Sequence, residues 1–238
     1  MTTESDWERE AENWVRWARA PGLDAYWDYR ASFFDRVVPT PGGLTLEVGC
    51  GEGRVARDLV SRGHRVVAVD SSRTLVSHAR DADHEGIYLV ADAAELPFSA
   101  AAFDLVVAYN SLMDVEDMPA AVAEAARVMS PRGRLCVCVT HPINDAGVFF
   151  DPGPDAEFVI SGSYFGRRRF EGTVERDGLT MTFRGWCYAL EDYARALEAA
   201  GLAIELLGEP TPADVSGQSR RARWRRVPMF LHLRCRRL

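Results

Sequence analysis

The chain of 238 residues is long enough to bury a sizeable core, and its 47% hydrophobic and 26% charged residues are ordinary for a globular protein. No apolar run approaches the roughly 18 residues of a membrane span, and the acidic N-terminus lacks the features of a signal peptide, so we expect no membrane segment and a cytoplasmic location. The net charge of −7 argues against a surface built as a whole for nucleic acid.

Two amphipathic helices are predicted first, over residues 5–20 and 24–38. Trp, Tyr and Phe residues recur at helical spacing in both segments, and Pro21-Gly22 separates them. Apolar stripes of this kind usually pack against a main domain, so we expect the two helices to form an N-terminal cap on the rest of the chain.

Strands and helices are predicted to alternate from residue 44 onward. Short apolar strands that alternate with helices indicate a parallel sheet with helices on both faces. A turn is expected at 130–133. The expected strands are 44–48, 65–70, 87–90, 103–108 and 134–139, and the expected helices are 54–61, a segment ending near 81, and 118–129.

The pattern changes after Thr140. Residues 141–166 are rich in Gly, Pro, Asp and aromatic residues and predict a loop-rich insertion. Two alternating runs flank Asp177-Gly178, which is a strong hairpin signal. We therefore predict one domain over 1–238, with an inserted hairpin. Its parts are the cap (5–38), the core (44–140), the insertion with hairpin strands 168–176 and 179–186 (141–186), and a C-terminal part (187–238) with a helix over 190–200 and strands over 202–207 and 227–235.

A glycine-rich loop, Gly49-Cys50-Gly51-Glu52-Gly53, joins the first strand to its helix. Such a loop presents backbone N–H groups and the positive end of a helix dipole to a ligand. A dinucleotide site is the obvious alternative, but its third glycine falls one position later, where this chain has Arg54. Glu47, at the strand end, would repel phosphates and suits the ammonium of an amino-acid moiety. The loop therefore argues against a dinucleotide.

Two aspartates follow the next strands. Asp70 ends the second strand, where a carboxylate can accept hydrogen bonds from both ribose hydroxyls. Asp92 follows the third strand and is placed to receive the exocyclic amine of an adenine. Asp104 begins the fourth strand, at the opposite end of the sheet, and is interpreted as structural.

Taken together, these motifs resemble those of the class I S-adenosylmethionine-dependent methyltransferases, and they are most similar to the branch of ubiquinone/menaquinone-biosynthesis-type and natural-product enzymes. The resemblance covers roughly residues 44–140 and implies a Rossmann-like fold, with a seven-stranded, mostly parallel sheet whose last strand is antiparallel. It rests on LEVGCGEGR at 46–54, VD at 69–70, ADAAELPF at 91–98, FDLVVAYN at 103–110 and ARVMSPRGRL at 126–135.

The resemblance implies S-adenosylmethionine as cofactor and S-adenosylhomocysteine as product. The methionine portion would meet the glycine loop, and the ribose, the adenine and the sulfonium would meet the ends of the second, third and fourth strands. Ser71 is also interpretable as a helix N-cap. The implied residues are Glu47, Gly49, Cys50, Gly51 and Gly53 for the methionine portion, Asp70 and Ser71 for the ribose, Asp92 and Ala93 for the adenine, and Tyr109, Asn110 and Ser111 for the sulfonium.

His141 is the candidate general base, for an acceptor that carries a proton. It directly follows the fifth strand, at the sheet edge where open α/β folds bind ligands. The alternative is a histidine that only hydrogen-bonds a loop before Pro142. Asp114 and Asp145 are secondary acid–base candidates.

Aromatic residues of the cap and of the insertion would roof the same edge. Such a roof suits an apolar or aromatic small molecule. Cys136 and Cys138 are interpreted as buried thiols on one strand face, and no metal is expected, because no further Cys/His pair lies nearby at zinc-like spacing. The substrate-side candidates are Trp14, Trp17, Tyr26, Tyr164 and Phe165.

The expected function is in-line methyl transfer to a small-molecule acceptor at O, N or C, with a homodimer as the assembly to test. A nucleic-acid methyltransferase is less well supported, since residues 110–113 lack the Pro-Pro motif of base-amine enzymes and the Arg220–Arg226 cluster is interpreted as a solvated loop. A third alternative is an enzyme of this fold that keeps the cofactor as a structural element and catalyses a rearrangement, and a fourth is a non-catalytic binding module.

Overall fold

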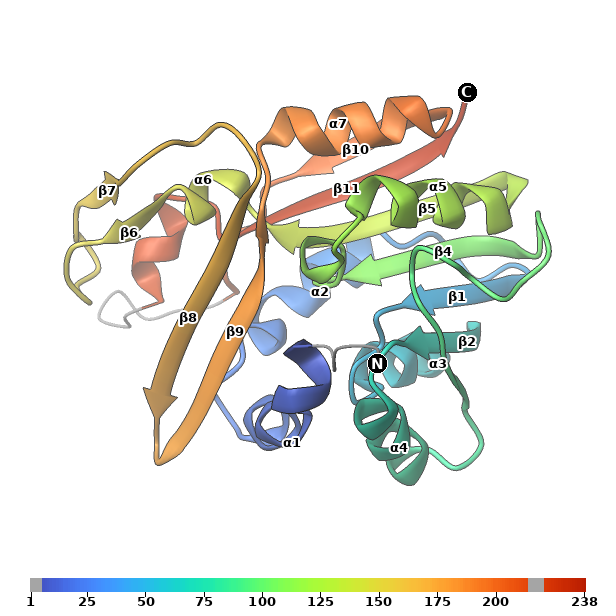
Figure 1. The fold of residues 1–238 in the computed structure, drawn as a ribbon, viewed down its shortest axis with the longest axis horizontal. Coiled ribbons are helices and arrows are strands. Elements are labelled where there is room, and N and C mark those ends of the chain that lie inside the picture. The colour runs from blue at the N-terminus through green and yellow to red at the C-terminus, as the bar shows by residue number, and fades with distance from the viewer. Residues whose placement is uncertain (1–5, 214–220) are drawn as a thin grey trace, which may run out of the picture.

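A seven-stranded sheet forms the centre of the computed structural model, which describes residues 6–213 and 221–238. The strand order is β10-β11-β5-β4-β1-β2-β3 (Figure 1). β11 is antiparallel to both neighbours, and the other pairs are parallel, so the predicted Rossmann-like sheet is confirmed. Its strands are β1 (Leu44–Val48), β2 (Arg65–Asp70), β3 (Ile87–Val90), β4 (Phe103–Tyr109), β5 (Met129–Thr140), β10 (Leu202–Gly208) and β11 (Phe230–Arg237).

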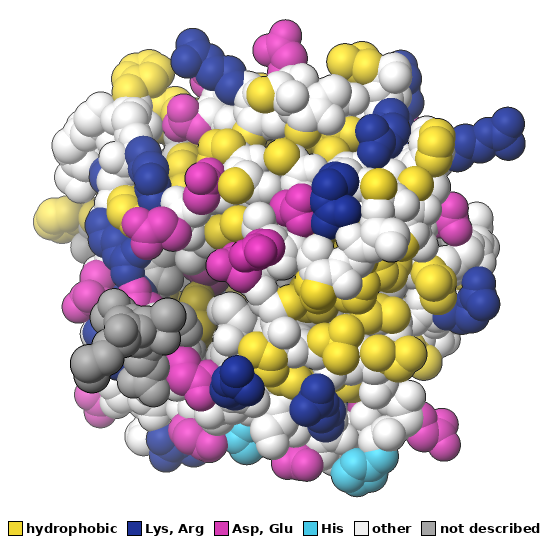
Figure 2. All heavy atoms as spheres, turned by 45° about the vertical axis from the view of Figure 1, so that its right-hand side comes forward, with side chains coloured by type: hydrophobic (Ala, Val, Ile, Leu, Met, Phe, Trp, Pro, Cys, Tyr) yellow, Lys and Arg dark blue, Asp and Glu magenta, His cyan; other side chains and the backbone are white. Residues whose placement is uncertain are grey.

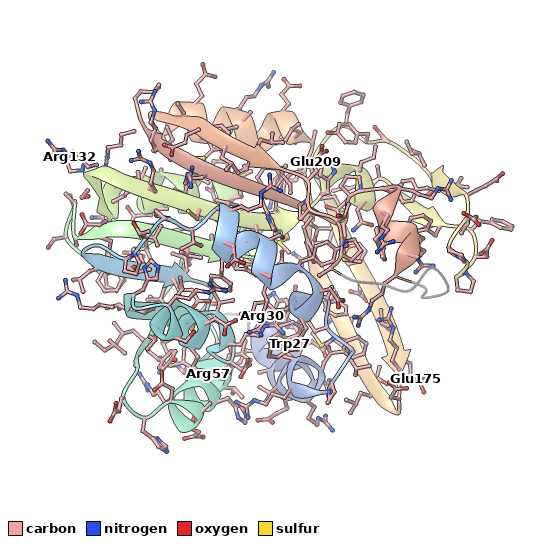
Figure 3. All side chains as sticks on the ribbon, turned by 180° about the vertical axis from the view of Figure 1, so that it is seen from behind. Trp27, Arg30, Arg57, Arg132, Glu175 and Glu209 are labelled. Atoms are coloured by element: carbon pink, nitrogen blue, oxygen red, sulfur yellow. The ribbon has the colours of Figure 1, made fainter. Side chains whose placement is uncertain are left out.

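Helices cover both faces of this sheet. α5 (Met118–Val128) and α7 (Leu190–Ala199) pack on one face, and α2 (Tyr26–Arg36), α3 (Arg54–Ser61) and α4 (Arg73–Ala82) pack on the other, as Figures 1 and 3 show from opposite sides. The split follows the alternation of the strands. Val106 and Val137 join the α5–α7 core, whereas Val107, Cys136 and Cys138 join the α2–α3 core. All five cysteines are free and buried, and the prediction that Cys136 and Cys138 share one strand face is confirmed.

The N-terminal helix α1 (Asp6–Arg19) lies between α4 and a hairpin formed by β8 (Arg168–Arg176) and β9 (Leu179–Cys187) (Figure 1). Trp17 of α1 packs edge-on against Phe183 of β9, with ring centroids 5.9 Å apart, and against the fully buried Met181. The turn Asp177-Gly178 has positive φ at both residues, as the predicted hairpin requires. The cap and the hairpin thus form one continuous wall beside the sheet.

The chain differs from the predicted elements in two places. β5 begins five residues early, and the expected turn at 130–133 forms a bulge inside it, where four residues lie opposite Asp104. Arg132 marks this end of the sheet in Figure 3. The expected loop at 141–166 contains α6 (Pro142–Asp145) and a short strand pair, β6 (Gly147–Phe149) and β7 (Phe158–Ile160). The short helices η1 (Leu112–Asp114) and η2 (Ala222–Arg225) complete the described elements.

Edge strand β3 is only partly covered. The segment between β3 and β4 contains no helix, and Ile87, Leu89 and Val90 are exposed. Figure 2 brings this side forward and shows hydrophobic side chains gathered there. Among the described residues, no helix has the length and apolar character needed to cross a bilayer.

Candidate functional site

The carboxyl ends of β1 to β5 meet at one edge of the sheet, and a cavity of about 1270 Å³ opens there. Each strand contributes to the lining at its end. The remaining walls come from α1, the β8–β9 hairpin, η1 and the segment after β5. Since a single ligand pocket usually measures roughly 300–1,000 Å³, this cavity has room for two ligands.

Most of the predicted cofactor positions are brought together at one side of this cavity. Gly53 is the exception: it does not line the cavity and instead occupies the N-cap position of α3. The predicted positions that line it are Glu47, Gly49, Cys50, Gly51, Asp70, Ser71, Asp92, Ala93, Tyr109, Asn110 and Ser111.

Glu47, at the end of β1, is a buried carboxylate that faces the cavity. Its side chain is 1% exposed, and its Oε2 has no hydrogen-bond partner. Burial raises the pKa of Glu47 well above its usual range, and the charges of Asp70 and Glu52 add to that increase. A buried acceptor without a partner requires an explanation. A cationic ligand in the cavity would provide one.

The glycine loop depends on backbone conformations that other residues rarely adopt. Gly49 has φ of +76°, and a Cβ at this position would lie 2.3 Å from the Cβ of Ser111. Ser111 is held in this place because its Oγ donates a 2.6 Å hydrogen bond to the carbonyl of Val48. Glycine at position 49 therefore lets the ends of β1 and β4 approach each other beneath the cavity.

Asp70 connects the glycine loop to α4. Its Oδ2 accepts a 2.8 Å hydrogen bond from the N–H of Gly51, and its Oδ1 accepts a 2.9 Å bond from the N–H of Ser72. Burial raises the pKa of Asp70, and these backbone bonds oppose that increase. Each carboxylate oxygen can accept a further bond. The N-cap of α4 is Ser72, not Ser71 as the sequence suggested, so Ser71 stays at the cavity.

The ends of β3 and β4 complete this side of the cavity. Asp92 is exposed at the rim, where its Oδ1 accepts a 2.8 Å bond from the N–H of Ala94. Asn110 has φ of +51°, and its N–H donates a 2.8 Å bond to the carbonyl of Cys138 on β5. Tyr109 is buried against the rings of Tyr26 and other cap residues.

His141 does not line the cavity, although the sequence suggested that it would act there as a base. Its Nδ1 accepts a 3.1 Å hydrogen bond from the N–H of Ile143, which makes it the N-cap of α6. Its Nε2 lies 3.1 Å from Oε1 of Glu209, which Figure 3 labels. Burial lowers the pKa of His141, and Glu209 opposes that decrease. These contacts match the alternative prediction, a histidine that holds the loop at Pro142.

Replacing His141 by Ala is therefore expected to reduce the free energy of unfolding by about 1 kcal/mol, the typical contribution of an N-cap. The lowered pKa makes the neutral ring the stabilising form, so this contribution is present above the unfolded-state pKa of about 6.5 and is lost as the pH falls toward the folded-state pKa. Urea unfolding of both proteins at neutral and acidic pH measures the difference. An unchanged unfolding midpoint at neutral pH would contradict the capping role.

The predicted aromatic roof is only partly at the cavity. Trp14 and Trp17 line it, but three other candidates do not. Tyr26 is buried and donates a 2.5 Å hydrogen bond to Oδ2 of Asp58. The OH of Tyr164 accepts a 3.0 Å bond from the N–H of Leu190, and Phe165 is 73% exposed. Among the aromatic and arginine residues that line the cavity, those that the sequence did not assign to it include Trp7, Arg54, Arg168, Arg169, Phe170, Phe183, Trp186 and Trp224.

Arg54 links the cap to the glycine loop. Its guanidinium lies between the rings of Trp14 and Tyr26, 5.0 and 4.3 Å from their centroids, and it forms a 3.2 Å ion pair with Asp24. Trp14 also lies over the loop, since a Cβ at Gly51 would be 3.3 Å from its Nε1. These contacts fix α1 against the glycine-loop side of the cavity.

The two secondary acid–base candidates, Asp114 and Asp145, both line the cavity. Burial raises the pKa of Asp114 well above its usual range, and a hydrogen bond from Trp7 opposes that increase. Burial raises the pKa of Asp145 to about 7, while the charge of Arg168 acts in the opposite direction. The carboxyl of Asp145 is therefore suited to exchanging protons near neutral pH, and the pKa of Asp114 is shifted in the same direction.

The described arginines of the C-terminal cluster include several that make contacts within the chain. Arg221 forms a 2.5 Å ion pair with Asp28, and Arg226 donates a 2.7 Å hydrogen bond to the carbonyl of Ala156. Arg220, the first member of the predicted cluster, lies outside the described residues. The described members thus connect the C-terminal part to the cap and to the insertion.

Comparisons with known proteins agree with this architecture. Residues 46–137 match the family model described as a methyltransferase domain. The chain is 35% identical over 124 residues to the nocamycin O-methyltransferase of Saccharothrix syringae, and the match covers 49% of this chain and 44% of that protein. It is 32% identical over 116 residues to the demethylmenaquinone methyltransferase of Beutenbergia cavernae, covering 49% and 48%. The matches thus span about half the length of these curated relatives.

A solved structure extends the likeness over nearly the whole chain. The crystal structure of an S-adenosylmethionine dependent methyltransferase from Mesorhizobium loti superposes with a TM-score of 0.69 at 26% identity, covering 90% of this chain and 98% of that chain. The likeness to this structure therefore extends well beyond residues 46–137.

Proposed function

We infer that this chain belongs to the class I S-adenosylmethionine-dependent methyltransferases, and we propose that it transfers a methyl group from S-adenosylmethionine to a small-molecule acceptor. The observation that carries the proposal is the buried Glu47 carboxylate, unpartnered at Oε2, at the same cavity edge as Asp70. A phosphate-rich ligand would be repelled from this edge, whereas an amino-acid and ribose ligand matches it.

The residues present fit the cofactor. Glu47 would receive its amino group, the free acceptor capacity of Asp70 would receive the ribose hydroxyls, and Asp92 with Ala93 would receive the adenine at the rim. Tyr109, Asn110 and Ser111, with the loop at 49–51, would enclose the methionine portion. Gly53 acts from outside the cavity by starting α3. When bound, the cofactor supplies a methyl group made electrophilic by a positively charged sulfur.

The opposite wall supports an apolar or aromatic acceptor. It combines Trp14 and Trp17 with aromatic residues of the hairpin, and these surfaces would hold a flat molecule and exclude water. The names of the two curated relatives refer to nocamycin and to demethylmenaquinone, which are small molecules. Holding the acceptor atom in line with the methyl group is the main task that these walls would perform.

Assembly and location stay predictions from the sequence: one domain over residues 1–238, a homodimer and a cytoplasmic location. Nucleic acid is not favoured, because Arg221, Arg223 and Arg226 of the C-terminal cluster contact the chain itself.

The test is product analysis with methyl-labelled S-adenosylmethionine and a panel of aromatic and apolar acceptors. We expect labelled product and S-adenosylhomocysteine in equal amounts. Conversion of an acceptor without release of S-adenosylhomocysteine would instead indicate a rearrangement that uses the cofactor structurally. Calorimetry that detects no cofactor binding would overturn the proposal.

A further inference from the structure

Asp114 lies at the boundary between the two sides of the cavity. It ends η1, three residues after Ser111, and it lines the cavity. The charge of Asp70, on the cofactor side, acts on its carboxyl group, and so do the charges of Asp145 and Arg169, on the acceptor side. A group in this position would stand beside both ligands.

Three elements fix the Asp114 carboxylate. Trp7 of α1 donates a hydrogen bond to it, and η1 supplies its backbone. On the third side, β9 passes so close that a Cβ at Gly185 would lie 2.6 Å from Oδ1 of Asp114 and 3.1 Å from the carbonyl of Met113. Glycine at position 185 therefore lets the hairpin pack against this carboxylate, which is positioned more firmly than a surface aspartate would be.

No cation neutralises this carboxylate directly. Across residues 6–213 and 221–238, no Arg or His forms an ion pair with Asp114, and Arg169 instead pairs with Asp6. Arg168 donates to the backbone carbonyl of Asp145. The titratable and charged groups on the surrounding elements are Asp6 and Arg9 on α1, Asp70 on β2, Glu116 and Asp117 after η1, Asp145 on α6, Arg168 and Arg169 on β8, Arg184 on β9 and Tyr193 on α7.

We propose that Asp114 is the catalytic base of this cavity and that the methyl acceptor is an N–H or O–H group. The inference rests on the proposed function. The acceptor heteroatom forms a bond to the methyl carbon as the carbon–sulfur bond breaks, the electrons of that bond stay on sulfur, and the acceptor proton passes to the Asp114 carboxylate. Solvent then receives the proton through the open cavity. His141 is not needed for this step, because its ring nitrogens already contact the N–H of Ile143 and the carboxylate of Glu209.

The environment of Asp114 supports such a role. Burial makes the charged form costly, so the ionised carboxylate is a stronger base than an exposed aspartate. A cation beside it would favour ionisation, and a sulfonium is such a cation. The ionisation of Asp114 should therefore be coupled to the presence of that positive charge.

This coupling can be measured without knowing the acceptor. S-adenosylmethionine carries the sulfonium charge, and S-adenosylhomocysteine has a neutral sulfur in its place. Calorimetry of both probes at a series of pH values, from acidic to alkaline, gives the ratio of their affinities at each pH. We expect the preference for S-adenosylmethionine to rise roughly tenfold as Asp114 ionises. In Asp114→Asn this rise should be absent.

Two further variants make the test specific. Glu116→Gln removes the same charge from the same loop, at a side chain that is 84% exposed, and should keep the wild-type rise. Trp7→Phe removes the hydrogen bond that lowers the pKa of Asp114, so the rise should move to higher pH. Thermal unfolding establishes that each variant is folded.

The outcomes separate the two proposals. If neither probe binds, the proposed function fails. If both bind and the affinity ratio is the same at every pH in the wild-type protein, or if Asp145→Asn rather than Asp114→Asn removes the rise, the assignment of Asp114 is overturned. A carbon acceptor in the product analysis would also overturn it.

Discussion

Replacing Asp70 by Ala is expected to weaken S-adenosylmethionine binding by about 100-fold or more. The carboxylate would accept two ribose hydroxyls, and each charge-assisted hydrogen bond contributes roughly 1.5–3 kcal/mol. The same oxygens hold the backbone N–H groups of Gly51 and Ser72, so the variant also loosens the glycine loop from α4. Isothermal calorimetry with S-adenosylmethionine measures the effect directly.

The matched control is Asp104→Ala. Asp104 lies at the opposite end of the sheet, where its carboxylate accepts a 2.9 Å hydrogen bond from Ser130. This variant should bind the cofactor as the wild-type protein does. Equal affinities for the wild-type protein and a folded Asp70→Ala variant would show that the ribose does not bind at the end of β2.

Replacing Glu47 by Gln is expected to change affinity and stability in opposite directions. Gln keeps the volume of the side chain but removes the charge that would pair with the cofactor's amino group, so affinity should fall by about 2–3 kcal/mol, roughly 30–150-fold. The ligand-free protein should become more stable, because the variant no longer buries an ionisable carboxyl whose Oε2 has no partner.

The pH dependence of this gain has a definite sign. Burial raises the folded-state pKa of Glu47, so the stability contribution of the protonated carboxyl is complete below the unfolded-state pKa of about 4.3 and is lost as the pH rises toward the folded-state value. The stability advantage of Glu47→Gln should therefore grow with pH over this window. Thermal unfolding without ligand, at a series of pH values, measures it. A variant that is less stable than the wild-type protein near neutral pH would show that burying the Glu47 carboxyl does not destabilise the ligand-free protein.

The glycine-loop side of the cavity, where the cofactor is proposed to bind, was predictable because its determinants are local. A strand, a glycine loop and a helix follow one another within residues 44–61, and parallel strands bring Asp70 and Tyr109 to the same edge once their strands are identified. The positive φ of Gly49, Gly51 and Gly53 explains why glycines occupy these positions. Sequence periodicity is sufficient for this part of the fold.

The acceptor side depends on tertiary contacts that periodicity does not encode. Tyr26 and Trp14 both lie on amphipathic helices, but Asp58 binds the hydroxyl of Tyr26 inside the protein, whereas Trp14 is left at the cavity. His141 follows β5, as predicted, yet the N–H of Ile143 and the distant Glu209 turn its ring away. The close approach of Gly185 to Asp114 joins segments 71 residues apart in the sequence, and no local pattern indicates it.

The bulge in β5 is a second feature that the local sequence pattern predicts only in part. Ser130-Pro131-Arg132-Gly133 has the composition of a turn, and it does leave the regular ladder. The strand nevertheless continues through it, because Met129 pairs with Phe103 beyond the bulge and Ser130 binds Asp104. Turn propensity located the irregularity but could not show that pairing resumes on the other side of it.

A crystal structure with S-adenosylhomocysteine would show whether the cofactor binds at Glu47 and Asp70. We expect the amino group of the ligand to lie within hydrogen-bond distance of Glu47 and both ribose hydroxyls to bind Asp70, with the sulfur directed toward Asp114 and the aromatic wall. A ligand bound elsewhere on the protein, or bound in this cavity with its amino group away from Glu47, would contradict this binding mode.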